Sequence, residues 1–192
     1  MASQNKVQYG LRNVHIFPKE ADVGGIPQYG APLKIPGAVT MVLEPRGEMI
    51  EFNADDMLYY ATTNNDGYNG TFTFALMPDE VAAVVTGEVK EGDFVHELAN
   101  NEGQEFAIAY EVQGDKNVTK HIVYNVKASR PTQTNNTKGT EVNTTELSFV
   151  ASPVDVAGKR HVKSKTHSGT TSETLDAWYT SVQGLVPAPA GV

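Results

Sequence analysis

The chain has 192 residues, of which 40% are hydrophobic and 20% charged, a composition typical of globular proteins that argues against disordered and collagen-like chains. It has no cysteine, which excludes disulfides, thiolate zinc sites and cysteine nucleophiles. The net charge of −8 argues against a protein that wraps nucleic acid, because that binding needs clustered lysine and arginine. The length predicts a single domain, residues 1–192.

The first half of the chain predicts β-strands. Apolar and polar residues alternate there with a period of two, which is typical of strands with one buried face. A helix is predicted at 78–85, because proline and acidic residues at 78–80 suit a first helical turn and Gly87 can end it. The predicted strands are 14–17, 38–43, 48–53, 57–63 and 71–76.

The second half predicts a hairpin of strands 105–113 and 118–128, joined by a turn at 114–117. Strands 145–151 and 160–165 follow, and then a helix that begins at Thr170 and stops at Gly184. In the hairpin one face is predicted to be core and the other to be wet or shared with a neighbouring molecule. The predicted core face consists of Phe106, Ile108, Tyr110 and Val112 with Ile122, Tyr124 and Val126.

Four segments are predicted to lie outside the core: an N-terminal arm 1–13, long loops at 18–36 and 130–143, and a C-terminal arm 184–192. Long loops inside a domain are usually functional or disordered. The first loop holds three apolar residues, Ile26, Tyr29 and Leu33, between glycines and prolines. These anchors pack either on the protein's own sheet or on another subunit, and the sequence leaves both interpretations open.

Acidic residues are concentrated in one part of the chain. Residues 44–105 contain 14 acidic residues and two basic ones. This excess is consistent with a solvated surface that aids solubility. It is also consistent with a polar subunit, whose acidic surface meets a basic surface on the next copy or repels a polyanion.

The sequence offers no catalytic or cofactor-binding pattern. Its five histidines lack the spacing of zinc ligands, and no phosphate-binding loop, dinucleotide fingerprint or nucleophile elbow is present. Asp55, Asp56 and Asp66 lie in turn-like segments without a complete calcium loop. The start lacks the apolar segment of a secretion signal, and no stretch is apolar enough to span a bilayer. We therefore expect neither an enzyme nor a membrane protein, and no metal or cofactor.

The order of short motifs resembles the major tail proteins of long-tailed, non-contractile bacteriophages of Gram-positive bacteria. The resemblance covers nearly the whole chain, and its specificity comes from the order of the motifs, since each is weak alone. The motifs are 7–15, 35–39, 54–60, 64–76, Pro78 and Asp79, 121–125, 128–131, 151–153, and Trp178 with Tyr179.

This resemblance implies a tail-tube fold, a β-sandwich or barrel with a flanking α-helix and long extended loops and arms. It also implies hexameric rings that stack into a hollow tube, in which neighbouring sheets join and through which phage DNA is ejected without specific binding. The implied partners are copies of the chain itself, a tape-measure protein in the lumen, and tail terminator and distal tail proteins at the tube ends. The implied location is the virion, after synthesis in the host cytoplasm.

Two sets of residues follow as candidates for these contacts. Acidic residues on polar strand faces are candidates for the lumen wall, where they would repel DNA phosphates. The lumen candidates are Glu48, Glu51, Glu105 and Glu111, and the inter-ring candidates are Ile26, Tyr29, Leu33, Arg130 and Lys138.

The main alternative function is that of a β-sandwich module of a virion that binds a receptor or carbohydrate. A second alternative is an enzyme built on a β scaffold.

Overall fold

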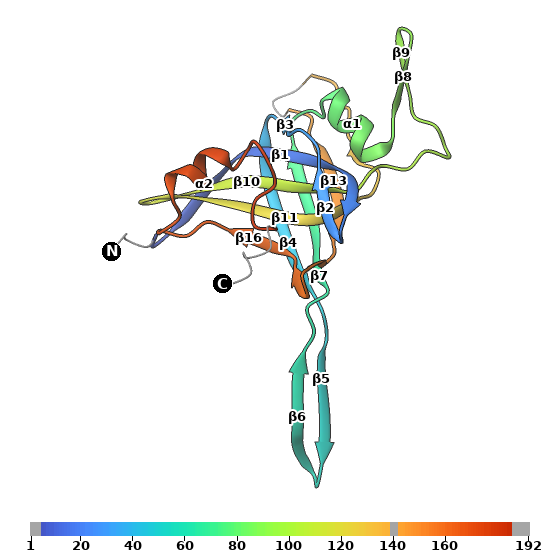
Figure 1. The fold of residues 1–192 in the computed structure, drawn as a ribbon. Helices are drawn as coiled ribbons and strands as arrows, with labels where there is room; N and C mark the ends of the chain where they lie inside the picture. The colour runs from blue at the N-terminus through green and yellow to red at the C-terminus, as the bar shows by residue number, and fades with distance from the viewer. Residues whose placement is uncertain (1–4, 139–141, 186–192) are drawn as a thin grey trace.

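The computed structural model describes residues 5–138 and 142–185. Strands dominate this part of the chain, which confirms the prediction of a mainly β fold (Figure 1). No helix within it is long and apolar enough to cross a membrane. The main sheet contains β1 (Gln8–Val23), β2 (Ile26–Tyr29), β3 (Leu33–Ile35), β4 (Ala38–Arg46), β7 (Gly67–Phe74), β10 (Phe106–Gly114), β11 (Val118–Ala128), β12 (Thr132–Gln133), β13 (Thr145–Ala151) and β16 (Lys163–Lys165).

Three two-stranded hairpins and two helices complete the described fold. The hairpins pair β5 (Met49–Ala54) with β6 (Met57–Thr63), β8 (Val89–Glu91) with β9 (Phe94–His96), and β14 (Val154–Val156) with β15 (Lys159–His161). Helix α1 (Asp79–Thr86) ends at Gly87, which has the left-handed φ of 74° expected of a helix stop. Helix α2 (Ser172–Ala177) is shorter than predicted and is capped by Thr171, whose hydroxyl accepts a bond from the Thr174 amide, and not by Thr170.

The main sheet folds into two layers that cross. Its path runs β2-β1-β10-β11-β13-β7-β4, so that β1, β10 and β11 form one layer and β13, β7 and β4 the other. Figure 1 shows the two sets of strands at a steep angle to each other. The larger core lies between the layers, and α1 packs against it. Its most deeply buried large side chains include Phe72, Phe74, Phe106, Ile108 and Leu147.

A β-bulge at Asn125 allows β11 to take part in both layers. Phe106 of β10 pairs with Val126 and Ile108 pairs with Val123, so one residue of β10 faces two of β11. Asn125 adopts a positive φ of 44° in this bulge. The bulge reverses the alternation, so Val126 lies in the core between the layers with Val123 and not on the face of Tyr124. The predicted core face was therefore right at Val126, which shares the first core with Phe106 and Ile108, and wrong at Ile122 and Tyr124, which lie in the second core.

Substitutions at Asn125 test the bulge. An Asn125→Gly variant should be as stable as the wild type, because glycine adopts this φ freely and the buried Asn125 Oδ1 has no hydrogen-bond partner. An Asn125→Val variant should lose about 1–2 kcal/mol of unfolding free energy, because a β-branched residue is strained at positive φ. Urea denaturation measures both values, and equal stability of the two variants would contradict this account.

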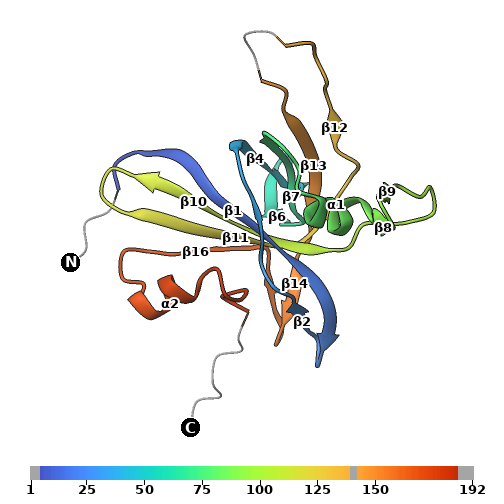
Figure 2. The same ribbon diagram turned by 90° about the horizontal axis from the view of Figure 1, so that it is seen from above.

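The second face of β10 is covered by the chain itself, contrary to the prediction that it is wet or shared. Ala107 and Ala109 of β10 are fully buried in a second core with Phe17 and Tyr124. Trp178, which follows α2, and Leu185 close this core from the other side. Figure 2 shows α2 on the side of β11 and β16 that faces away from β4, β7 and β13. Alanines at 107 and 109 therefore make room for the C-terminal segment.

Two predicted boundaries are wrong. The N-terminal arm 1–13 is not free along its length, because β1 begins at Gln8 and pairs with β10 from there. The loop 18–36 is not structureless: β1 continues to Val23, turns through two glycines with positive φ, and returns as β2 and β3. Part of the predicted C-terminal arm, residues 186–192, and the first four residues lie outside the described residues. In the loop 130–143, the described part contains the short strand β12.

Candidate assembly surfaces

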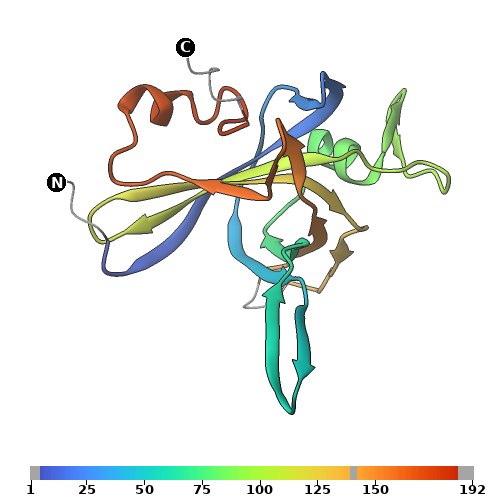
Figure 3. The same ribbon diagram turned by 60° about the horizontal axis from the view of Figure 1, so that its bottom comes forward.

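The β5–β6 hairpin stands away from both layers, and we call it the arm. Figures 1 and 3 show it pointing away from the body of the molecule, with no other described segment along its sides. A hairpin of two strands is marginally stable alone in water. Seven large apolar side chains of the arm are between 55% and 72% exposed: Met49, Ile50, Phe52, Met57, Leu58, Tyr59 and Tyr60.

The register of the arm gathers most of these side chains on one face. Phe52 pairs with Tyr60 and Ala54 pairs with Met57, while Ile50 lies two residues before Phe52 on the same face. A shift of register between Phe52 and Asn53 leaves Tyr59 as the extra residue. Its ring meets that of Phe52 edge to face at 6.3 Å. The arm therefore carries a continuous apolar face that no segment within residues 5–138 and 142–185 covers.

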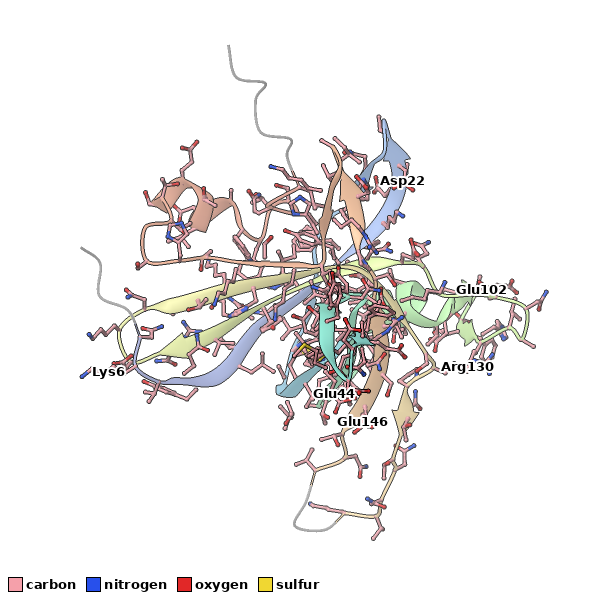
Figure 4. All side chains as sticks on the ribbon, turned by 90° about the horizontal axis from the view of Figure 1, so that it is seen from below. Lys6, Asp22, Glu44, Glu102, Arg130 and Glu146 are labelled. Carbon is pink, nitrogen blue, oxygen red and sulfur yellow. The ribbon has the colours of Figure 1, made fainter. Side chains whose placement is uncertain are left out.

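The outer face of β4, β7 and β13 is polar and hollowed. Its cross-strand rows are Thr40, Thr73 and Glu146, then Val42, Thr71 and Ser148, then Glu44, Asn69 and Val150. A hollow of about 490 Å³ opens on this face between β4 and the end of β11. Figure 4 shows Glu44 and Glu146 on the side of the layer that faces away from β10 and β11. We call this surface the polar face.

A basic surface lies at the C-terminal side of the body, on β15 and β16. Its four basic residues, Lys159, Arg160, Lys163 and Lys165, are exposed, and we call them the basic ridge. Lys163 Nζ lies 4.4 Å from the centre of the Tyr68 ring. Tyr68 is the second residue of β7, just after the base of the arm. Lys163 of the basic ridge therefore lies near the base of the arm.

Glu111, predicted to line a lumen, is buried instead in a cluster of charges. Its carboxylate accepts a hydrogen bond of 3.1 Å from Arg12 Nε and lies 3.6 Å from Lys120 Nζ. Lys120 also donates to the Leu175 carbonyl of α2 at 2.7 Å and lies 5.0 Å from the centre of the Tyr179 ring. Burial and the nearby negative charge of Glu111 raise the pKa of Tyr179. Glu111 thus ties the C-terminal segment to β10 and β11.

The other three lumen candidates differ in their surroundings. Glu105 is paired with Lys19, whose Nζ donates to its carboxylate at 2.9 Å and also lies 3.2 Å from Asp22. Burial lowers the pKa of Lys19, but the two carboxylates outweigh this effect and raise it. Glu48 and Glu51 lie at the base and on the first strand of the arm, where both are exposed. The structure therefore does not bring the four carboxylates together.

The inter-ring candidates fall into two groups. Ile26 and Tyr29 pack on the second core and Leu33 on the first, so these anchors contact the protein's own body. Burial raises the pKa of Tyr29. Arg130 and Lys138 are exposed, and Arg130 Nε forms an ion pair of 2.9 Å with Glu97. The apolar anchors are thus partly buried on the protein's own body, and the contact of either group with another ring stays a prediction.

His121, on β11, gives the stability of the fold a measurable dependence on pH. Its ring stacks on Tyr110 at 5.0 Å, and burial together with Lys165 and Lys163 lowers its pKa to about 4. The unfolded chain binds a proton near pH 6.5 and the folded chain near pH 4, so stability falls as the pH drops between these values. A His121→Gln variant should lose less stability than the wild type between pH 7 and 4.5. The urea midpoints of the two proteins at pH 7 and at pH 4.5 measure the difference. An equal loss of stability in the variant and the wild type would contradict this account.

The arm and the basic ridge were missed as surfaces, although their strands were predicted. Residues 57–60 are all apolar, so they lack the alternation of a strand with one wet face, and this was the available signal. Glu44 and Glu146 of the polar face were also missed. Their position on one face follows from the pairing of β7 with both β4 and β13, which are about a hundred residues apart in the chain.

No protein-family model matches the chain, and no curated protein matches its sequence. Several solved structures are similar in outline. A chain of the sheath-tube complex of an extracellular contractile injection system is 9% identical, with a TM-score of 0.48 over 84% of this chain and 93% of that chain. The tube terminating cap of the anti-feeding prophage is 11% identical, with a TM-score of 0.46 over 86% and 96%. A type six secretion system protein is 14% identical, with a TM-score of 0.38 over 79% and 91%.

Proposed function

We propose that this protein is the non-catalytic structural subunit of a tail tube, of the kind found in long-tailed, non-contractile phages of Gram-positive bacteria. Its copies form hexameric rings that stack into a hollow tube in the virion, and phage DNA leaves through the bore. A tape-measure protein occupies the lumen before ejection, and terminator and distal tail proteins close the two ends. The resemblance of the sequence motifs supports the proposed family. The exposed surfaces of the fold support the proposal that the copies assemble.

The arm is the observation that carries this proposal. The seven exposed apolar side chains of the arm lie close together, and contiguous exposed apolar surface marks interaction sites because its contact with water is unfavourable. The main sheet adds a second argument. Its edge strands are β2 and β4, and within the described residues each of them pairs with a neighbouring strand on one side only. Open sheet edges invite pairing with another chain, and a closed ring removes them. A subunit with an apolar arm and open edges is suited to repeated self-association.

The polar face is our candidate for the wall of the bore. It is hollowed, and small or polar side chains surround Val42 and Val150 there. Lys127 lines the edge of the hollow, but the exposed acids of the face repel DNA phosphates, so that the genome slides past. Glu105 and Glu111 suit this role poorly because each is neutralised by a cation. We therefore assign the bore to Glu44 and Glu146, with Glu48 at the adjoining base of the arm.

Reversing these charges should slow DNA release. Phages that carry Glu44→Lys and Glu146→Lys should assemble tails of normal length, because both side chains are exposed and unpaired within the described residues. Their DNA should leave several-fold more slowly, because a basic wall attracts phosphates. Release triggered in vitro and followed with a DNA-binding dye measures the rate. A phage that carries Glu173→Lys on α2 is the control. Equal rates of DNA release from the wild-type phage, the phage with both lysine substitutions and the control phage would refute the assignment.

The alternative of a receptor-binding or carbohydrate-binding module gains no support from the aromatic residues. Such a module needs exposed aromatic side chains in a concave site. Trp178 is 4% exposed and belongs to the second core. The exposed aromatic residues of the arm lie on a projecting hairpin, which is the opposite shape.

Negative-stain electron microscopy of the purified protein at increasing concentration tests the proposed function. Rings, or tubes with a central hole, are the expected particles, and native mass spectrometry should find six copies in a ring. A protein that stays monomeric at every concentration, and that is missing from purified phage particles, would overturn the proposal.

A further inference from the structure

The tip of the arm is both acidic and aromatic. Asp55 and Asp56 form its two-residue turn with φ values of 52° and 60°, and Glu51 lies on the strand that leads to it. Tyr59 and Tyr60 are the third and fourth residues of the returning strand β6, and both are exposed. None of the three carboxylates forms an ion pair with any other described residue. The tip therefore presents two unpaired carboxylates, with Glu51 further back on β5 and the rings of Tyr59 and Tyr60 on β6.

The basic ridge has the complementary chemistry. Its four cations likewise form no ion pair with described residues of the same molecule. Lysine and arginine bind carboxylates by charge-assisted hydrogen bonds and bind aromatic rings through the cation. The chain already uses the second contact twice, where Lys163 lies over Tyr68 and Lys120 over Tyr179. The ridge is therefore suited to both groups that the tip offers.

The two surfaces cannot meet within one molecule. The arm extends away from the body (Figures 1 and 3), whereas Lys163 contacts Tyr68 beside the base of the arm. Seven residue steps from the base to the tip correspond to about 20–25 Å at the rise of a β-strand. A second copy displaced by that length along the arm brings its own basic ridge level with the tip of the first.

We propose that the tip of the arm docks on the basic ridge of a second copy of this chain, in the neighbouring ring of the tube. This inference rests on the proposed function and names the contact that stacks the rings. Tip and ridge are different surfaces, so the contact is heterologous, and a displacement along the arm does not close on itself. Each ring then offers free tips on one side and free ridges on the other, which lets stacking continue.

Charge exchange between the two surfaces tests the contact. The tip variant carries Glu51→Lys, Asp55→Asn and Asp56→Asn, since asparagine keeps the positive φ of the turn. The ridge variant carries Lys159→Glu, Arg160→Glu, Lys163→Glu and Lys165→Glu, and a third protein combines all seven changes. A control carries Glu91→Lys and Asp93→Asn on the β8–β9 hairpin and Glu88→Gln directly before it, which changes the net charge as much as the tip variant does. Circular dichroism shows whether each protein is folded.

The expected results separate stacking from ring formation. The tip and ridge variants should each form single rings with at least tenfold less tube mass in sedimentation, while the control forms tubes and the combined variant recovers them. Normal tubes from the tip or the ridge variant, or single rings from a folded combined variant, would overturn the contact and leave the tube proposal standing. A wild type that forms neither rings nor tubes would overturn both.

Discussion

A protein in which residues 49–63 are replaced by Asn-Gly is expected to stay folded and to form no tubes. Glu48 and Asn64 are already joined by a hydrogen bond of 3.0 Å at the base of the arm, and a two-residue Asn-Gly turn closes such a pair. No residue of the deleted segment belongs to either core, so the unfolding free energy should change by less than about 1 kcal/mol. Thermal unfolding measures stability, and electron microscopy at high concentration measures assembly.

Point variants separate the shape of the arm from its apolar face. Phe52→Ser with Tyr60→Ser removes a cross-strand aromatic pair but leaves the length of the hairpin unchanged. These variants should also fail to form tubes, because the apolar area that assembly buries is lost. Normal tubes from the shortened protein would show that the arm has no part in assembly. Tubes from the serine variants alone would assign the contact to the backbone and charges of the arm.

Glu111→Ala should lower the unfolding free energy by about 2–4 kcal/mol, because it leaves Lys120 mostly buried without its carboxylate. The value is below the range for a fully buried pair, since the side chain of Arg12 is 52% exposed and keeps contact with water. Loss of the cluster should also loosen the C-terminal segment, because Lys120 holds α2 through the Leu175 carbonyl. Urea denaturation and the fluorescence of Trp178, the single tryptophan, measure the two effects.

Glu48→Ala is the matched control for Glu111→Ala. Glu48 is exposed and forms no ion pair within the described residues, so its removal should change stability by less than about 0.5 kcal/mol. Equal stability of the two variants would show that Glu111 is not a structural anchor. It would also restore Glu111 as a candidate for the wall of the bore.

Local patterns predicted the elements of this fold well. The strands 57–63 and 145–151 match β6 and β13 residue for residue, because each is bounded by turn residues that fix its ends. The segment 18–36 was mistaken for a loop, because its glycines and prolines were taken as breaks. Gly24 and Gly25 form a tight turn instead, and on either side of it the chain pairs as strands. Turn residues thus located the ends of strands but did not show whether the strands pair across them.

The candidate surfaces were harder to predict because they depend on contacts between distant parts of the chain. Glu111 alternates with apolar residues as a wet residue would, and only the approach of Arg12, Lys120 and α2 makes it buried. The arm was predicted as two ordinary strands, and its isolation follows from the absence of a neighbouring strand within the described fold. A one-dimensional pattern gives the face of a side chain but not what covers it.

The bulge at Asn125 has a mechanical consequence. Because β11 belongs to both layers, a force applied to one layer reaches the other through covalent bonds and not only through side chains that can slide. In a cylinder built from such units, friction from cargo moving along the inner wall would be borne by continuous polypeptide. In the proposed tube, the shared strand would therefore connect the lining to the outer shell.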